Sequence, residues 1–418
     1  MARTLTPVDA HQIMNLLLRQ ATGEQALNVT DTSSFISAGE LVMATGMENV
    51  TNSVSIVMNR LIVASRAYNA RMRIVQTDEV GSYSNRARKI SFYSQNALPD
   101  GSHNTNLFTN LAAGYTSGEN GGASTKSQWE QHPAMPLEMN FAGTNVWQHC
   151  ITMYEDQLKI AFRNENEFNR FVSGYLQEHA NDIEQEREGF YRALLLNRIG
   201  MTFDMTADMP DALVDLTSAF NTFYGTSYTT AQLLSTYLKE FSAFFTAQIK
   251  MYSDYMENRS VNFHWSVPKT VGGDTFNILR HTPKRDQRLA IYAPYFRMTE
   301  ALVMPEIFNP QYLSIENYEP VTFWQAEASK DAINITPAII ETDSTDPAYG
   351  TQIQGSAVAE DHIIAVLFDR DAVFGELQLD RADSTPLEAR KHYRNVWNTF
   401  AKNGVSDPTE NFIVFYMS

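Results

Sequence analysis

Two apolar segments near the C-terminus constrain the fold more than any other feature of the sequence. Residues Ile363–Phe368 are a continuous run of apolar side chains, and Phe412–Tyr416 are a second run close to the last residue. A terminal strand is ordered only where it pairs with the rest of the protein. We therefore expect the C-terminus to be built into a sheet.

A helix is expected between these two strands. Thr385 is a suitable N-cap, Pro386 suits the first helical position, and Glu388 follows three residues after the cap. Gly404 would end the helix. Its apolar face would consist of Leu387, Tyr393, Val396, Trp397 and Phe400.

Three longer segments point to a family. They are AVLFDRDAV at 365–373, HYRNVWNTFAKNGVSDPTENFIVFYM at 392–417, and HTPKRDQRLAIYAPYFRMTEALVMPEIFNPQYLSIENYEPV at 281–321. Together they resemble the major capsid protein of tailed bacteriophages, which has the Hong Kong 97 fold, and the order of parts agrees along nearly all of the chain. The resemblance implies an α+β structural protein, not an enzyme, that self-assembles into an icosahedral shell packaging double-stranded DNA.

The resemblance also implies a division of the chain into five parts. These are an N-terminal arm (1–72), an extended β-hairpin loop with flanking strands (73–160), the spine helix of the peripheral domain (161–200), an axial domain (201–360), and peripheral-domain strands, a helix and the C-terminal strand (361–418).

Residue patterns support several of these parts. Residues 164–199 have the longest helical pattern, with apolar side chains recurring on one face. Helices are also expected at 6–23, at 211–224 and from Thr229 onward, where Thr229 and Gln232 form a capping box. Short amphipathic pieces around 38–46 and 50–70 need another surface to pack on.

Residues 86–145 resemble a long two-stranded excursion. Residues 88–94 alternate as a strand does, 125–130 are expected to pair with them, and the segment between is rich in Gly, Asn, Ser and Thr. An isolated ribbon is only marginally stable in water. We expect an arm that lies on a neighbouring subunit; a flexible insertion and a lid over an active site are the alternatives. A further strand is expected at 146–162.

Composition narrows the class of protein. The 418 residues are 43% hydrophobic and 19% charged, as in a globular protein. The net charge of −16 argues against a general nucleic-acid-binding surface. The single cysteine, Cys150, excludes an intramolecular disulfide and fits assembly in the host cytoplasm. Neither a signal peptide nor a membrane span is expected. The resemblance to capsid proteins implies that the protein resides in the virion.

No catalytic or cofactor chemistry is expected. Gly118–Gly122 lacks the Gly-Lys-Ser/Thr ending of a phosphate-binding loop, and the histidines lack metal-binding spacing. Serine and cysteine lack the sequence context of nucleophiles. In the run Asp369-Arg370-Asp371, structural ion pairing is favoured over a carboxylate dyad. The alternative function is a soluble hydrolase or binding protein with 86–145 as its lid.

The expected partners are other copies of the chain in hexamers and pentamers, a scaffolding protein, a portal, and packaged DNA bound without sequence specificity. The mature shell is expected to lack covalent cross-links, although Lys89 and Lys126 with Asn395, Asn398 or Asn403 could supply one. The candidate inter-subunit contacts are Arg86, Arg88, Lys89, Lys126, Trp129, Asp369, Arg370, Asp380, Arg381 and Arg390.

Overall fold

The protein is described here from a computed structural model. The structure describes residues 11, 12, 14–16, 18, 19, 29–44, 72, 74, 75, 77–79, 86–94, 135–143, 145–154, 165–271, 274–303, 318–386, 388 and 390–418. The expected strand at 125–130, the short pieces at 50–70, and residues Lys126 and Trp129 lie outside this set.

Helices and strands are mixed along the chain. The helices are α2 (Thr32–Ala44), α6 (Glu165–Asp204), α7 (Leu216–Tyr224), α8 (Thr230–Leu233), α9 (Leu238–Glu257) and α10 (Ala293–Val303). The strands are β1 (Thr77–Glu79), β2 (Arg86–Phe92), β3 (Pro136–Ala142), β4 (Asn145–Tyr154), β5 (Leu213–Asp215), β6 (Lys269–Val271), β7 (Asp274–Phe276), β8 (Gln287–Tyr292), β9 (Tyr318–Val321), β10 (Ile333–Ile335), β11 (Ala338–Ile340), β12 (Gln352–Gln354), β13 (Val358–Glu360), β14 (Ile363–Asp369), β15 (Val373–Ser384), β16 (Tyr393–Ser406) and β17 (Phe412–Tyr416).

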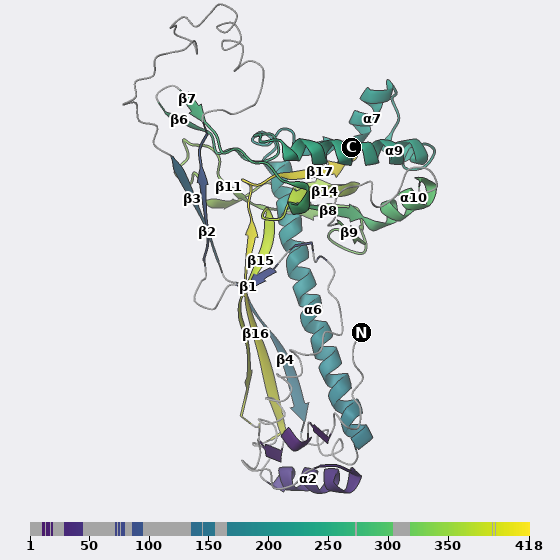
Figure 1. Cartoon of the computed structure of the whole chain (residues 1–418), viewed down its shortest axis with the longest axis vertical. Helices are drawn as coiled ribbons and strands as arrows, with labels where there is room; N and C mark the ends of the chain where they lie inside the picture. Colours follow the sequence, from purple (N-terminus) through teal and green to yellow (C-terminus); the bar gives the residue numbers. More distant parts are fainter. Residues whose placement is uncertain are drawn as a thin grey trace, which may run out of the picture.

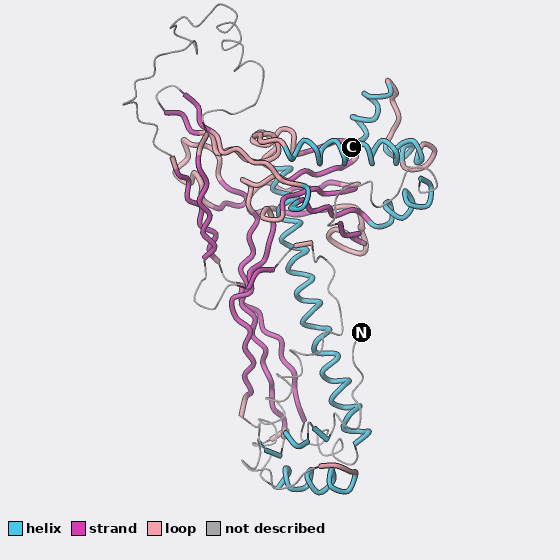
Figure 2. The backbone as a smooth tube through the Cα atoms, viewed as in Figure 1, coloured by secondary structure: helices cyan, strands magenta, loops and turns pink. Residues whose placement is uncertain are grey.

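The molecule is a compact domain with a long arm. A five-stranded mixed sheet of order β5-β17-β14-β8-β9 forms the domain, and a four-stranded sheet of order β1-β15-β16-β4 runs along the arm beside α6 (Figure 1). With 40 residues, α6 is about 60 Å long and belongs to both parts. Figure 2 shows the strands of the arm extending nearly to α2 at its far end.

The core of the compact domain lies on both faces of the five-stranded sheet. Leu367 and Ile413 pack in the cluster that contains the buried side chains of α7, α9 and α10. Val366 and Val414 belong to the cluster formed with α6. Every residue of β14 is buried, which explains why its sequence is apolar without alternation from Ile363 to Phe368. The expected strands at 363–368 and 412–416 are confirmed, and they pair with each other.

A pair of glycines lets α6 cross the arm sheet closely. Gly375 of β15 lies opposite Gly404 of β16. A Cβ atom at Gly404 would lie 2.4 Å from Leu194 Cδ2, and one at Gly375 would lie 2.8 Å from the Tyr191 ring. A side chain at either position would have to displace the side chains of Leu194, Tyr191 or Phe190 on α6.

The helix expected at 385–404 is wrong. Residues 393–406 form β16, which pairs with β15 and β4. Gly404 is therefore a close-approach position and not a helix stop. Thr385 lies in the turn between β15 and β16, where its Oγ1 accepts from Asn395 N at 3.1 Å. Residues typical of helix caps occur in this connection between strands because short polar side chains bond nearby backbone groups in both settings.

The other expected elements have mixed outcomes. The long helix is confirmed as α6, and 146–162 contains β4 up to Tyr154. The capping box of Thr229 and Gln232 is present, but its helix ends at Leu233, and α9 begins anew at Leu238. Among the described residues, β2 pairs with β3. The described positions of 11–19 are helical, consistent with part of the helix expected at 6–23. No helix among the described residues is long and apolar enough to cross a membrane.

Acid is expected to weaken the packing of α6 on the arm sheet. His179 of α6 is buried beside Asn398 of β16, and burial, with His149 adding to it, lowers the pKa of His179 to about 4. The unfolded chain binds this proton below about pH 6.5, so this contribution to the free energy of unfolding should be lost as pH falls from about 6.5 to 4. Chemical denaturation across that pH range should show that the free energy of unfolding falls less steeply with falling pH in His179→Gln than in the wild type. The same pH dependence in both proteins would contradict the role of His179.

Candidate functional site

The β2–β3 hairpin has two different faces. Its strands pair in antiparallel register from Arg86 opposite Ala142 to Phe92 opposite Pro136. On one face, the side chains of Ile90 and Phe92 are 53% and 58% exposed. On the other face, Lys89 and Ser91 contact the rest of the chain. Alternate residues of a strand point to opposite faces, so one short sequence supplies an anchor and an exposed apolar surface.

The anchor is a group of charged side chains that we call the charged hub: Lys89, Arg198, Arg280, Asp407 and Glu410. The Lys89 ammonium pairs directly with the Asp407 carboxylate and lies 2.5 Å from Glu410 Oε1. Arg280 Nε lies 3.0 Å from the same Glu410 oxygen. The Asp407 side chain is 1% exposed. The free-energy cost of removing its carboxylate from water therefore has to be offset by the cations of the hub.

Burial determines the protonation of the hub. It raises the pKa of Glu410 to about 6, although Lys89 and Arg280 act in the opposite direction. Burial would also raise the pKa of Asp407, but Lys89 and two hydrogen bonds from Thr409 outweigh it, and the net shift is downward. Arg198 is completely buried, and desolvation lowers its pKa to about 10. At neutral pH the hub therefore contains paired, charged groups.

The hub connects parts that are distant in the sequence. Arg198 of α6 donates to Glu410 O at 3.3 Å and stacks on the Phe412 ring, with its Cζ 4.6 Å from the ring centroid. Arg280 donates to Ser91 Oγ at 2.6 Å and to Thr409 O at 3.0 Å. The hairpin, the long helix and the turn before β17 are thus held at one point, which fixes the direction of the hairpin.

The residues expected at inter-subunit contacts lie in several places. Arg88 is on the exposed hairpin face and pairs with Glu138 at 2.6 Å. Arg381 of β15 pairs with Asp383 at 2.7 Å, and Arg390 is exposed in the turn before β16. Arg86 and Asp380 lie in β2 and β15. Lys89 is used within its own subunit.

The run Asp369-Arg370-Asp371 is a turn at the end of β14. Arg370 pairs with Asp371 at 3.3 Å on the surface, as expected. Asp369 instead is buried and accepts from Thr282 Oγ1 at 2.7 Å, and burial raises the pKa of its carboxyl. Asp369 also interacts electrostatically with Lys89 of the hub, which acts to lower its pKa. Four members of the hub, Arg198, Arg280, Asp407 and Glu410, were not predicted from the sequence.

Arg370→Ala is expected to disturb assembly more than folding. The Arg370–Asp371 pair is exposed, and such pairs stabilise a subunit by only about 0–1 kcal/mol. The melting temperature should change little, whereas particles should form more slowly or with more aberrant shapes. Lys330→Ala, at another exposed position, is the control. A large drop in melting temperature with normal particles would make Arg370 a fold residue.

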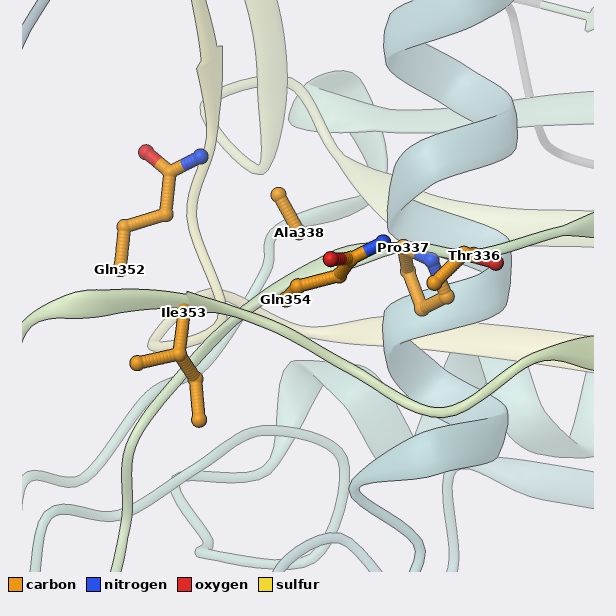
Figure 3. A pocket seen from close by; sticks show the side chains of 6 residues that line it. All are labelled: Thr336, Pro337, Ala338, Gln352, Ile353 and Gln354. Atoms are coloured by element: carbon orange, nitrogen blue, oxygen red, sulfur yellow. The ribbon is translucent and has the colours of Figure 1, made fainter.

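A shallow pocket lies next to α6. It has a volume of about 410 Å³ and is lined by Thr336, Pro337, Ala338, Gln352, Ile353 and Gln354 (Figure 3). None of these side chains is an acid or a base, so the lining offers no group that could activate the hydroxyl of Thr336 as a nucleophile. In the described part of the chain, no group of three or more His, Cys, Asp and Glu residues could hold a metal ion.

Comparison with known proteins connects this architecture to phage capsids. Residues 141–416, more than half of the chain, match the family described as Phi29-like phage major capsid protein. No curated protein matches the chain.

Solved capsid structures also resemble the chain. A chain in the capsid structure of Staphylococcus phage Andhra has 10% sequence identity and a TM-score of 0.49, with 84% of this chain and 85% of that chain covered. A chain in the mature capsid of bacteriophage PhiM1 has 10% identity and a TM-score of 0.41, with 84% of this chain and 88% of that chain covered. A chain in the structure of the head fiber and inner core protein gp22 of bacteriophage P68 has 8% identity and a TM-score of 0.48, with 82% of this chain and 83% of that chain covered.

Proposed function

Because the chain belongs to the family of Phi29-like phage major capsid proteins, we propose that its copies form hexamers and pentamers of an icosahedral shell that encloses double-stranded DNA. Its role is structural and not enzymatic, its place is the virion, and its α+β fold is Hong Kong 97-like. Assembly takes place in the host cytoplasm.

The two-faced β2–β3 hairpin is the observation that carries this proposal. Ile90 and Phe92 are large apolar side chains on the exposed face of a ribbon whose other face is anchored to the charged hub. Contiguous exposed apolar surface marks interaction sites. A neighbouring copy of the chain is the partner that a shell provides. Residues 86–145 then supply contacts to neighbours, while Lys89 anchors the hairpin to its own subunit.

Other copies, a scaffolding protein, a portal and DNA are the proposed partners. A net charge of −16 on each subunit disfavours tight binding to the phosphates of the packaged DNA. The shell therefore encloses the DNA without recognising its sequence. Within the shell, Arg86, Arg88, Arg370, Asp380, Arg381 and Arg390 are proposed to orient subunits by charge pairing, with Lys126 and Trp129 as further contacts. Asp369, which is buried in its own subunit, is not among them.

Expression of the chain alone tests the proposal. Sedimentation velocity across a range of concentrations should show oligomers, and negative-stain microscopy should show shells or partial shells. A monodisperse monomer at every concentration would contradict self-assembly. Uniform shells from the chain alone would remove the need for a scaffolding protein, whereas shells of irregular size that become uniform with it would support that partner.

The structure bears on a covalent cross-link between subunits. A lysine that attacks an asparagine must be uncharged and needs a buried carboxylate to accept its proton. Glu410, with its raised pKa, is such a carboxylate beside Lys89. The Lys89 amine, however, is paired with two acids, and Asn398 and Asn403 are buried within their own subunit.

Mature particles are therefore expected to contain no cross-linked subunits. After boiling in detergent and reduction, a denaturing gel should show one band near the chain mass of 47.3 kDa. A ladder of multiples would overturn this expectation. Repeating the gel with Lys89→Arg and Lys126→Arg particles would then identify the lysine responsible.

A further inference from the structure

Four buried polar side chains form a row of hydrogen bonds where the arm joins the compact domain. Asp369 Oδ2 lies 2.7 Å from Thr282 Oγ1, which lies 3.1 Å from the side-chain nitrogen of Asn411. The side-chain oxygen of Asn411 lies 3.0 Å from His264 Nδ1, and His264 Nε2 lies 2.9 Å from Ile278 O. Asp369 is 8% exposed, and the other three side chains are fully buried. We call these four side chains the buried relay.

The buried relay spans two connections between the sheets. Asp369 ends β14 and precedes the turn into β15, whereas Asn411 lies in the segment between β16 and β17. The backbone also joins these connections, because Asp369 N donates to Asn411 O at 2.9 Å. Asp407 N donates to Ala372 O, also at 2.9 Å. The relay therefore lies where the arm sheet and the five-stranded sheet are held to each other.

The relay is incomplete when Asp369 is ionised and His264 is neutral. The Asp369 carboxylate then accepts from Thr282, and the Thr282 hydroxyl accepts from the Asn411 amide. This leaves both ring nitrogens of His264 facing oxygen atoms. A neutral imidazole has only one N–H group, so one ring nitrogen would meet an acceptor inside the protein.

One proton on Asp369 removes this conflict by reversing the hydrogen bonds. The carboxyl group donates to Thr282, and the Thr282 hydroxyl donates to the Asn411 oxygen once the amide is turned by half a rotation, which its shape allows. The amide N–H donates to His264 Nδ1, and His264 Nε2 donates to Ile278 O. Asp369 Oδ1 still accepts from Asp371 N at 2.8 Å. Every group of the relay then has a partner.

The surrounding charges favour this state over a charged imidazole. Burial lowers the pKa of His264 to about 4, and Arg280 and Lys89 act in the same direction. Burial raises the pKa of Asp369, and Asp371 adds to the rise, whereas its hydrogen bonds and Lys89 oppose it. Arg288 also interacts with Asp369. The two nearest hub cations are themselves paired with Glu410.

We propose that the buried relay binds one proton at neutral pH, held on Asp369, and that loss of this proton in alkali loosens the joint between the arm and the compact domain. The relay is a pH-sensitive device within the single subunit and does not depend on contacts between copies.

The sign of the pH dependence follows from the unfolded chain, in which aspartate and histidine have pKa values of about 3.9 and 6.5. Between about pH 4 and 6.5 both states hold one proton, on Asp369 when folded and on His264 when unfolded. Above about pH 6.5 only the folded relay holds it. The equilibrium constant for unfolding should therefore rise by up to about tenfold per pH unit until the relay releases its proton.

Asp369→Asn tests the proposal because an amide N–H replaces the carboxyl proton at the same position. Chemical denaturation of the full chain from about pH 6.5 to 8.5 should show the rise in the wild type and not in this variant. Asp371→Asn, at a neighbouring carboxylate that is 61% exposed, is the matched control and should keep the wild-type pH dependence. The same pH dependence in Asp369→Asn and the wild type would overturn the proposal.

Infrared spectroscopy tests the proton without any substitution. Wild-type chain labelled with ¹³C in its aspartate carboxyl groups should show the absorption of a protonated carboxyl at neutral pH and lose it in alkali. Glutamate is unlabelled, so Glu410 does not contribute. Hydrogen exchange of the amides at 369–372 and 407–411, corrected for its intrinsic pH dependence, should speed up over the same range in the wild type but not in Asp369→Asn. Fully ionised aspartates at neutral pH, or equal exchange in both chains, would contradict the proposal.

Discussion

Lys89→Met is expected to lower the free energy of unfolding of the subunit by about 3 kcal/mol or more. The substitution leaves the buried Asp407 without its closest cation and leaves Glu410 with Arg280 as its direct cationic partner. Removing one member of a buried ion pair typically costs about 3–5 kcal/mol because the remaining charge is desolvated without compensation. Chemical denaturation of the isolated subunit at neutral pH measures the loss.

Lys284→Met provides the matched control. Lys284 pairs with Asp254 at 2.7 Å on an open surface, so the same substitution should cost no more than about 1 kcal/mol. The double variant Lys89→Met with Glu410→Gln should be less destabilised than the sum of the two single variants. Equal, small losses for Lys89→Met and Lys284→Met would show that the charged hub does not secure the hairpin.

The second large effect is expected on particles and not on folding. Ile90→Ser with Phe92→Ser removes the apolar surface of the hairpin face that points away from the hub. The melting temperature of the subunit should hardly change, since both side chains are already more than half exposed. The yield of particles should fall at least about tenfold if these side chains are central contacts.

Met298→Ser is the control for the hairpin variant, because it truncates an exposed apolar side chain elsewhere. Particle counts by negative-stain microscopy at equal protein concentration compare the three chains. Normal particles from the hairpin variant would leave the exposed face without a role in assembly. A large drop in its melting temperature would instead mean that the face packs within its own subunit.

The sequence correctly predicted strands that are buried on both faces, because all of their side chains are then apolar. The strand at 363–368 lies with both faces in the core, so its apolar run is unbroken. Residues 393–406 were misassigned because their alternation is interrupted by polar side chains on the buried face. In β16, Val396 and Phe400 point inward, but so do Arg394 and Asn398. Because Arg394 and Asn398 are polar, the alternation of apolar and polar residues that marks a strand is not visible in the sequence. The cap-like residues Thr385 and Glu388 before this segment then favoured the prediction of a helix.

The charged hub could not be predicted from the sequence. Its members come from β2, α6, a loop and the turn before β17, and 318 positions separate Lys89 from Asp407. Each charge alone has the pattern of an ordinary surface residue. A local signal exists only at Asp407, whose side chain accepts from the backbone and hydroxyl of Thr409. This Asx turn marks a tight turn before an apolar strand, but it does not indicate that the other carboxylate oxygen of Asp407, Oδ2, binds Lys89.

The glycine pair makes the crossing of α6 and the arm sheet sensitive to the smallest substitution. A Cβ atom at Gly375 would lie within 3 Å of the Tyr191 and Phe190 rings, and one at Gly404 would lie 2.4 Å from Leu194. Even alanine at either position would therefore have to displace side chains through which the helix packs on the sheet. At these two positions a hydrogen atom in place of a methyl group keeps the long helix and the arm in direct contact.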